Sequence, residues 1–302
     1  MTIDAHQHFW DPGRADYPWM QGDAMAPIRR PFGPTDLAPL LDADGIDASI
    51  LVQTRSSVAE TEEFLGIADV TPFVAGVVGW VDLTNPAVGA TIDRLRTLRG
   101  GRKLIGIRHQ VHDEPDANWL CRADVQHGIE AVIRRDLAYD FLVRTRELPA
   151  ATATARAFPQ GRFVLDHCAK PPIAAGFDQI WAGRFAELAA CTNVWCKVSG
   201  LATEAMWDDW DAERLSSYVA HAARCFGEDR LIFGSDWPVC LLAGDYGTIK
   251  RALERCLARL GPSFRDKAFG SNAKAAYRLS LQLCRQNRIV MPTWLRSKPS
   301  RS

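Results

Sequence analysis

Two histidines near the start of the chain are spaced so that they could act together. His6 and His8 flank Gln7 in an apolar segment that predicts a β-strand. Side chains two residues apart in a strand point to the same face, so both imidazoles would project from one end of this strand. Imidazoles placed in this way can ligate a metal ion or move protons. The chain has seven histidines, so the spacing alone is a weak motif, and chance is the alternative explanation.

A carboxylate near the end of the chain is the second candidate. Asp236 closes the apolar run LIFGSD. Burying a carboxylate without a partner is costly, so this group should face polar partners or solvent. A helix cap or a turn is the ordinary alternative for such an aspartate. If the run is the eighth strand of a closed barrel, Asp236 lies beside His6 and His8, where it could act as a general base or a metal ligand.

A third candidate lies in the segment VLDHCAKPP. Asp166 and His167 end the sixth predicted strand. Alternation along a strand places only one of them on the barrel axis, and we select His167. The alternative for His167 is a hydrogen-bonded histidine of the core. Lys170 follows in a short, proline-rich loop where a substrate oxygen would arrive, although most lysines are solvated surface residues.

Three more residues are predicted to bind substrate. Arg108 and His109 end the fourth predicted strand, and a guanidinium fork could hold a substrate carboxylate or hydroxyls. A structural salt bridge is an equal alternative for Arg108. Trp10 follows the first strand, where an indole face could pack against a sugar ring. The chain has ten tryptophans, so a structural role is the default for each one.

Other chemistries find little support. The sequence contains no GxSxG nucleophile elbow and no glycine-rich fingerprint for phosphates or dinucleotides. Cys168 and Cys240 follow predicted strands, but neither has an evident base partner. The eight cysteines form no CxxC pair, and most lie in apolar segments, so we interpret them as small buried side chains and not as disulfides.

These residues must be positioned by a regular alternation of short apolar runs and longer amphipathic segments. Eight runs predict strands buried on both faces, and the segments between them predict helices. The pattern predicts a single-domain, distorted (β/α)8 TIM barrel, with an open doubly wound sheet as the alternative. The predicted strands cover residues 2–8, 47–53, 73–81, 103–109, 139–143, 162–167, 193–199 and 230–236, and the predicted helices cover about 36–44, 61–70, 86–98, 123–137, 144–157, 178–191, 211–226 and 246–260. Residues 9–34 form a long loop that could act as a lid.

Composition narrows the function classes. The chain of 302 residues is 47% hydrophobic and 24% charged, as in an average soluble protein. It has 36 basic and 36 acidic residues, so no excess of positive charge indicates a nucleic-acid partner. The start MTIDAHQHFW is not a signal peptide, and no apolar run approaches the roughly 18 residues of a membrane span. We expect a cytoplasmic protein with a barrel over residues 1–284 and a basic tail over 285–302.

Several segments together resemble one known superfamily. IDAHQHFW at 3–10, LDHCAKPPI at 165–173 and LIFGSDWPVC at 231–240 look like the amidohydrolase superfamily, and more narrowly its lactonase-rich branch. GIRHQV at 106–111 with EPDANWL at 114–120 resembles the sugar lactonases of that branch, which is related to the pyrone-dicarboxylate lactonases. The likeness extends from residue 3 to about residue 282, where SNAKAAYRL at 271–279 is similar to the closing helix of the family.

The resemblance implies a barrel with a hydrolytic site made by His6, His8, His167 and Asp236. Many members of the superfamily hold one or two divalent metals with such residues. This sequence has no lysine or glutamate on its fourth strand that matches a bridging ligand of the two-metal pattern. The lactonase branch also includes members that need no metal. We therefore expect at most one divalent ion such as Zn²⁺, held by these four residues, and no strictly required cofactor.

The resulting hypothesis is the opening of a small sugar lactone to its aldonic acid. Asp236 would take a proton from water, while the three histidines, or a metal that they hold, would polarise the carbonyl. Lys170, Arg108, His109 and Trp10 would hold the sugar. The alternatives are a metal-dependent decarboxylase or amide hydrolase of the same superfamily, and a non-catalytic carbohydrate-binding barrel. The sequence gives no oligomeric state.

Overall fold

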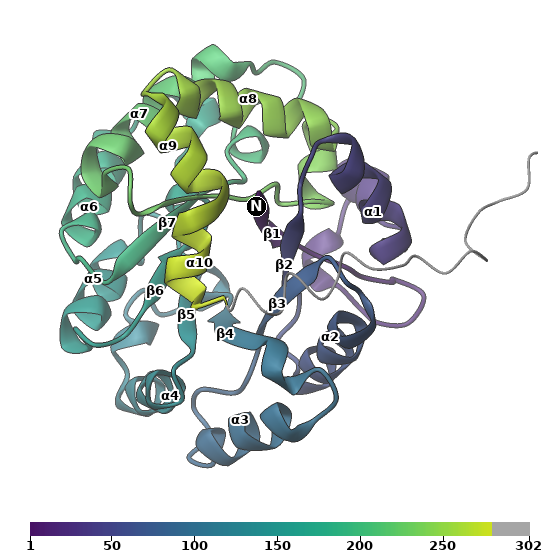
Figure 1. Ribbon diagram of the computed structural model, residues 1–302. Helices are drawn as coiled ribbons and strands as arrows, with labels where there is room; N and C mark the ends of the chain where they lie inside the picture. Colours follow the sequence, from purple (N-terminus) through teal and green to yellow (C-terminus); the bar gives the residue numbers. More distant parts are fainter. Residues whose placement is uncertain (280–302) are drawn as a thin grey trace, which may run out of the picture.

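Eight parallel strands form the centre of the protein. A computed structural model describes residues 1–279, in which β1 to β8 pair in sequence order (Figure 1). The strands are β1 (Ile3–Gln7), β2 (Ala48–Val52), β3 (Val74–Gly79), β4 (Leu104–His109), β5 (Ala138–Phe141), β6 (Phe163–Leu165), β7 (Val194–Val198) and β8 (Leu231–Phe233). A parallel bridge between Gln7 and Trp237 joins the last strand segment to the first. The predicted TIM barrel is confirmed, and each predicted strand is present in a shorter form.

A helix follows each strand and packs around the outside of the barrel (Figure 1). The helices are α1 (Pro34–Ala43), α2 (Val58–Val70), α3 (Val88–Thr97), α4 (Ala123–Arg134), α5 (Leu148–Ala157), α6 (Gln179–Ala189), α7 (Ala212–Phe226) and α8 (Tyr246–Ala258), followed by α9 (Pro262–Asp266) and α10 (Asn272–Tyr277). The start of α1 differs from the prediction. Gly33 is its N-cap, and the Asp36 carboxylate accepts the Gly33 backbone N–H at 2.9 Å. The acidic side chain therefore caps the helix from inside its first turn.

One end of the barrel is closed by apolar packing. The short helix α10 lies across the end of the barrel where β1 begins (Figure 1). Ala273 and Ala276 of this helix are fully buried against a cluster of side chains from the strands. Members of this lower apolar layer include Ile3, Ala5, Ile50, Ile105, Val164 and Ile232. Closing this end leaves the opposite end, where the strands terminate, for the polar residues.

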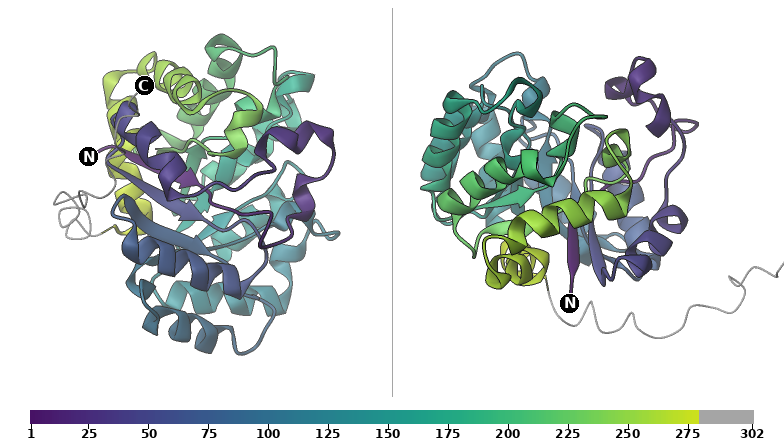
Figure 2. Two further views of the ribbon diagram at one scale, coloured as in Figure 1. Left: turned by 90° about the vertical axis from the view of Figure 1, so that its right-hand side faces the viewer. Right: turned by 90° about the horizontal axis from the view of Figure 1, so that it is seen from above.

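The segment between β1 and α1 lies at that opposite end. Figure 2 shows it on the side of the barrel away from the N-terminus. Within the predicted long loop lie two 3₁₀ helices, η1 (Pro18–Met20) and η2 (Asp23–Ile28). Trp10 anchors it, because its indole N–H donates to the Ile28 carbonyl at 3.0 Å and the side chain is buried.

Two other expectations concern the ends and the surroundings of the chain. The predicted basic tail, residues 285–302, lies outside the described residues. Within residues 1–279, no helix has the length and apolar character needed to cross a membrane. All described cysteines are free thiols, and five of them are buried, as expected for small apolar side chains.

Candidate active site

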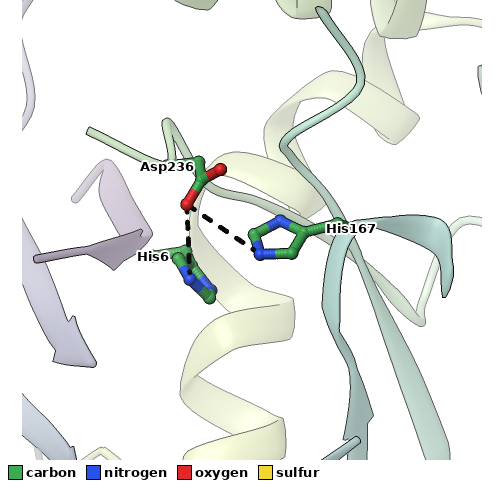
Figure 3. A group of neighbouring side chains, drawn as sticks. All are labelled: His6, His167 and Asp236. Atoms are coloured by element: carbon green, nitrogen blue, oxygen red, sulfur yellow. Dashed lines mark ion pairs between the residues drawn. The ribbon is translucent and has the colours of Figure 1, made fainter. Parts of the chain in front are cut away.

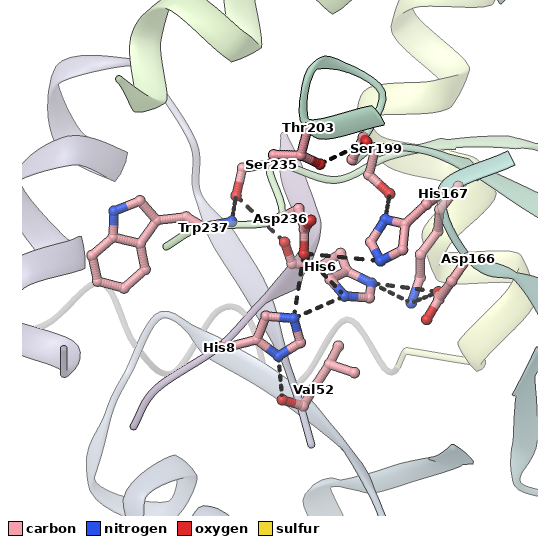
Figure 4. Close-up of polar contacts among 12 residues, drawn as sticks. His6, His8, Val52, Asp166, His167, Ser199, Thr203, Ser235, Asp236 and Trp237 are labelled. Atoms are coloured by element: carbon pink, nitrogen blue, oxygen red, sulfur yellow. Dashed lines mark hydrogen bonds and ion pairs between the residues drawn. The ribbon is translucent and has the colours of Figure 1, made fainter. Parts of the chain in front are cut away.

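Four predicted side chains meet at the carboxyl ends of the strands. His6 and His8 come from β1, His167 follows β6, and Asp236 follows β8 (Figures 3 and 4). One carboxylate oxygen of Asp236, Oδ1, faces the Nε2 atoms of all three imidazoles, at 3.6 Å for His6, 3.4 Å for His8 and 3.9 Å for His167. The structure thus brings the four predicted residues together around one point.

A break in strand regularity directs His6 into the barrel. The pairing of β1 with β2 shifts register between Asp4 and Gln7. Ala5 belongs to the lower apolar layer, yet the next residue, His6, also points inward, which an undisturbed alternation would forbid. Asp4 holds the distortion in place: its Oδ1 accepts the backbone N–H groups of Ser235 at 2.8 Å and His6 at 3.2 Å.

Left-handed backbone conformations position the other two groups. Asp236 has φ of 59°, and His167 begins a run of four non-glycine residues with φ between 49° and 59° that ends at Lys170. Left-handed conformations are costly for residues with a Cβ and are concentrated at functional sites. The backbone N–H of Asp236 donates to the His6 carbonyl at 2.8 Å, which ties the strained turn to β1.

Two glycines leave the space that the imidazoles need. A Cβ on Gly234 would lie 2.6 Å from the Cβ of His6, and a Cβ on Gly200 would lie 2.7 Å from Nδ1 of His167. Both contacts are closer than real Cβ atoms allow. The close approach of the backbone to the histidines therefore requires glycine at both positions.

The prediction that only one of Asp166 and His167 faces the axis was wrong. β6 ends at Leu165, and residues 166–169 form a 3₁₀ turn, η6 (Asp166–Ala169), with left-handed torsion angles at His167. Asp166 keeps the inward phase of Val164, and the turn sends His167 inward as well. Asp166 is fully buried and pairs with Arg108 at 2.9 Å.

The site is almost closed to solvent. His6 is fully buried, whereas His8, His167 and Asp236 each keep 3–4% of their surface exposed. Burial lowers the pKa of His6 well below its ordinary value and lowers the pKa of His167 to about 4. Burial alone would raise the pKa of Asp236, but the surrounding imidazoles outweigh it and the pKa lies below its ordinary value. Near neutral pH the site therefore combines an ionised carboxylate with neutral imidazoles.

The donor set has the dimensions of a mononuclear metal site. A tetrahedral zinc ion with bonds of 2.0–2.1 Å has ligand atoms about 3.4 Å apart. Nε2 of His6 lies 3.1 Å from Nε2 of His8, and Asp236 Oδ1 lies 3.4–3.9 Å from the Nε2 atoms of the three histidines, so these four spacings surround that value. His6, His167 and Asp236 in particular offer ligand atoms that all lie within 4.8 Å of one another (Figure 3). These residues fit one divalent ion.

In His8 and His167, the ring nitrogen that faces away from Asp236 has its own hydrogen-bond partner. Nδ1 of His8 lies 2.7 Å from the Val52 carbonyl oxygen, and Nδ1 of His167 lies 2.9 Å from Oγ of Ser199 (Figure 4). Such contacts fix the orientation of a ring whether it ligates a metal or donates a hydrogen bond to substrate.

The predicted substrate-binding residues lie in different places. Lys170 is at the rim and forms an ion pair with Glu204. Trp10 packs beside His8, with ring centroids 6.3 Å apart. Arg108 lies below the site, with Nη1 3.3 Å from Nε2 of His6. His109 does not join the cluster.

His109 is held on the outer side of β4 by its neighbours. Its Nδ1 accepts the indole N–H of Trp80 at 2.9 Å, and its Nε2 contacts Glu114 at 2.7 Å. Its ring also stacks on Trp119 with centroids 4.3 Å apart. Both ring nitrogens are therefore used within the protein.

Sequence reasoning missed two buried charges beneath the histidines. Lys197 of β7 and Asp140 of β5 form an ion pair that is fully buried from solvent, with Nζ of the lysine 2.7 Å from Oδ2 of the aspartate. A signal was present, because each stands inside an apolar strand segment, NVWCKVS or AYDF. A charge in a strand buried on both faces requires a partner of opposite sign.

Comparison with known proteins agrees with this geometry. Residues 3–279 match the amidohydrolase family. The chain belongs to the amidohydrolase family. An L-fucono-1,5-lactonase of Burkholderia ambifaria is 44% identical to it over 281 residues, covering 92% of this amidohydrolase and 95% of the relative. An L-fucono-1,5-lactonase of Burkholderia multivorans is 39% identical over 294 residues, covering 92% and 96%. A crystal structure of a Burkholderia multivorans amidohydrolase with bound Zn is 39% identical to this chain in sequence and has a TM-score of 0.87. The match covers 93% of this chain and 100% of that chain.

Proposed function

We propose that this amidohydrolase opens a sugar 1,5-lactone, with L-fucono-1,5-lactone or a close stereoisomer as its substrate. The expected lactonase activity is supported by the two L-fucono-1,5-lactonases that share 44% and 39% of their residues with almost the whole chain. The observation that carries the proposal is the single carboxylate oxygen of Asp236 facing three imidazoles at the open end of the barrel.

The first step is attack by water on the lactone carbonyl. Asp236 is ionised and accepts one proton from the water as its oxygen bonds to the carbonyl carbon. The carbonyl π electrons move to oxygen, and the resulting oxyanion is stabilised by N–H groups of the imidazoles. Because the site is almost fully buried, these hydrogen bonds act in a region of low dielectric constant, where they are stronger than in water.

The second step breaks the ring. The oxyanion re-forms the carbonyl, the bond to the ring oxygen breaks, and Asp236 returns its proton to the departing alkoxide. The product is an open-chain hydroxy acid, which ionises and releases one proton to the solution near neutral pH. The carboxylate of Asp236 is regenerated, so no other residue needs to change its protonation state over the cycle.

A divalent ion such as Zn²⁺, held by His6, His8, His167 and Asp236, would supply Lewis-acid polarisation of the carbonyl when bound. The zinc-containing relative and the close spacing of the donor atoms of His6, His167 and Asp236 support this arrangement. Lys170 at the rim is proposed to donate to a sugar hydroxyl, and Trp10 to hold His8 in place. Arg108 is assigned to the support of Asp166 and His6, because only 3% of its surface is exposed.

A panel of aldonolactones tests the proposal. Proton release is measured for 1,4- and 1,5-lactones of differing stereochemistry, with and without an exhaustive chelator. We expect the largest kcat/KM for L-fucono-1,5-lactone or a lactone that differs from it at one centre. Saturable binding of sugars without turnover of any lactone would instead indicate a carbohydrate-binding barrel. Turnover only of amides or aromatic acids would indicate one of the other hydrolytic or decarboxylating activities.

A further inference from the structure

A surface groove lies between α8 and the loop that follows β7. It has a volume of about 380 Å³, which is within the usual range of small-molecule pockets. One wall is a single face of α8, because Thr248, Arg251 and Arg255 follow one another at spacings of three and four residues. The other wall is the segment 207–212, which leads into α7, the neighbour of α8 in the ring of helices (Figure 1). The described residues that line the groove include none of the four side chains that meet around Asp236 Oδ1.

Two indole rings line the groove in fixed orientations. The indole N–H of Trp207 donates to the Thr203 carbonyl at 2.9 Å, and that of Trp210 donates to the Ala243 carbonyl at 2.8 Å. Both tryptophan side chains are partly exposed. Because the polar edge of each ring is used within the protein, each ring offers a ligand apolar surface whose position is already set. Binding on such a surface loses little side-chain entropy.

The charged side chains of the groove balance one another. Two aspartates, Asp208 and Asp211, and two arginines, Arg251 and Arg255, line it. Asp211 is used as the N-cap of α7, and Arg251 donates to the Thr248 hydroxyl at 3.2 Å. Asp208 and Arg255 are exposed, and neither side chain has a hydrogen-bond or ion-pair partner within residues 1–279. The groove therefore offers one free acceptor group and one free donor group, with no net charge.

This combination fits a sugar ring better than an ion. A pyranose has a face of C–H groups that can pack on an indole, which removes apolar surface from water. Its hydroxyl groups both donate and accept, so they can pair with a carboxylate and with a guanidinium. A phosphate would meet the carboxylates of Asp208 and Asp211, and a cation would meet two guanidiniums. Like charges brought together in this way oppose binding.

We propose that the groove is a second carbohydrate site, which holds a neutral pyranose ring on Trp207 and Trp210 and binds its hydroxyls through Asp208 and Arg255. Such a ring is common to a free monosaccharide and to the end of a glycan. The site goes beyond the proposed lactonase function and does not depend on it, because the hydrolytic step uses none of these four residues.

The indole N–H signals of the whole protein provide the first test. ¹H–¹⁵N correlation spectra of protein labelled with ¹⁵N-tryptophan resolve these groups, and the Trp207→Phe and Trp210→Phe variants assign the two signals of the groove. We expect both signals to shift in a saturable way with L-fucose, with a Kd on the order of millimolar, because a single ring has few atoms to bind. Methyl α-L-fucopyranoside, a model for the end of a glycan, should shift the same signals. A smaller Kd for the glycoside would identify the glycan as the preferred source of the ring, and a smaller Kd for L-fucose the free sugar.

Two results of this titration would overturn the proposal. One is that the Trp207 and Trp210 signals stay in place up to about 100 mM of either sugar. The other is that they move equally with glycerol, which has hydroxyls but no ring face. A response to L-fuconate without a response to L-fucose would indicate an anion site and would also contradict a neutral ring. The titration uses no lactone, so a failure of the lactone panel leaves it intact.

Matched variants provide the second test. Arg255→Gln and Asp208→Asn each remove one hydrogen-bonding charge from the groove at an exposed position, where the fold tolerates substitution. Their controls are Arg224→Gln on α7 and Asp209→Asn, which change exposed residues of the same types outside the groove lining. Asp209 pairs with Arg214 on the surface, at 2.9 Å.

For Arg255→Gln and Asp208→Asn we expect the Kd of L-fucose at the groove to rise about fivefold. The kcat/KM of any lactone that the wild-type enzyme hydrolyses should stay within about twofold, because the hydrolytic residues are untouched. The two controls should keep the wild-type Kd. An unchanged Kd in both groove variants, or an equal rise in the controls, would overturn the proposal. A parallel loss of sugar binding and of kcat/KM would place the sugar in the hydrolytic site and would overturn it as well.

Discussion

The two halves of the barrel interior are filled in opposite ways. In the half covered by α10, apolar side chains such as Ile50 and Val164 pack with the alanines of that helix. In the half where the strands end, Lys197, Asp140 and Asp166 occupy the axis with no exposed surface, directly under the histidines. Barrel interiors are usually packed with branched apolar residues, so the charged side chains in the half where the strands end depart from the general pattern.

The contrast separates stability from function. Apolar burial contributes about 25 cal/mol per Å² and needs no exact partner. Buried ion pairs are costly to desolvate and are often no more stabilising than apolar side chains of similar volume. A charged layer that adds little to stability is best explained by the groups it orients, namely His6 and, through the strained turn of η6, His167. The two halves should therefore respond to mutation in different observables.

The largest effect is expected for the carboxylate above the charged layer. Asp236→Asn removes the proton acceptor and should lower kcat by about 10³-fold, with little change in the urea midpoint of unfolding. Steady-state lactone hydrolysis at saturating substrate measures it. Asp245→Asn is the control, because Asp245 caps α8 by accepting the Thr248 N–H at 2.7 Å and asparagine is an equally good cap. A variant at position 236 that kept nearly full kcat would refute the assigned role.

A substitution in the apolar half should lower stability and leave the activity of the folded enzyme nearly unchanged. Ile50→Ala leaves a cavity at a fully buried site and should lower the free energy of unfolding by about 2–5 kcal/mol, with kcat/KM of the folded enzyme within about twofold of wild type. Urea unfolding followed by circular dichroism measures the loss. Ile180→Ala is matched in chemistry but lies at a position that is 63% exposed, and should change stability by less than about 0.5 kcal/mol. Equal losses of unfolding free energy in the Ile50→Ala and Ile180→Ala variants would contradict the assignment of stability to the apolar half.

The apolar half was the easier part to predict from sequence. Strands buried on both faces produce runs such as FVAGVVGWV, and the eight runs predicted the barrel and its closing contact between Asp236 and β1. The charged half depends on local irregularities. The register shift after Asp4 and the left-handed turn at His167 both break the alternation on which a prediction of side-chain direction depends. Asp166 was excluded for that reason.

Lys197 and Asp140 were missed for a different reason. Their positions inside apolar strands indicated paired charges, but their partners are set by the neighbouring strands and lie 57 residues apart in the chain. Nothing in the local sequence of either strand specifies that pairing. His109 shows the converse, because its place at a strand end resembled that of a site residue, while Trp80 and Glu114 hold it on the outer side.

The pH dependence of the free energy of unfolding should arise mainly from the histidines in the half of the barrel where the strands end. The pKa of His167 falls from an ordinary value of 6.5 to about 4 on folding, because burial disfavours the charged ring. Between these pH values the unfolded chain binds a proton that the native protein does not, so the free energy of unfolding falls as the pH falls from about 6.5 to 4. The loss is on the order of 3 kcal/mol for this one group. His6 shifts in the same direction.

Urea unfolding of chelator-treated protein at pH 7 and pH 5 measures this loss. His167→Asn serves as the comparison, because it removes the His167 imidazole and keeps a polar side chain in the turn. The variant should lose less stability than wild type over the same interval. Equal losses in the two proteins would mean that His167 is protonated in the native state at pH 5.

The smallest expected effect lies at the rim, above both halves. Lys170→Met should raise KM for the preferred lactone about tenfold, because one hydrogen bond from a charged donor to the sugar is lost, while kcat changes less than about threefold. Glu204→Gln should raise KM by a smaller factor, since Glu204 pairs with Lys170 and would act through it. Lys267→Met, which removes a surface lysine paired with Glu228 and Asp229, is the control and should leave KM unchanged. If KM stays constant while both rim variants unfold at lower urea concentration, the Lys170–Glu204 pair only joins the turn after β6 to the loop after β7, and the sugar is recognised by other residues.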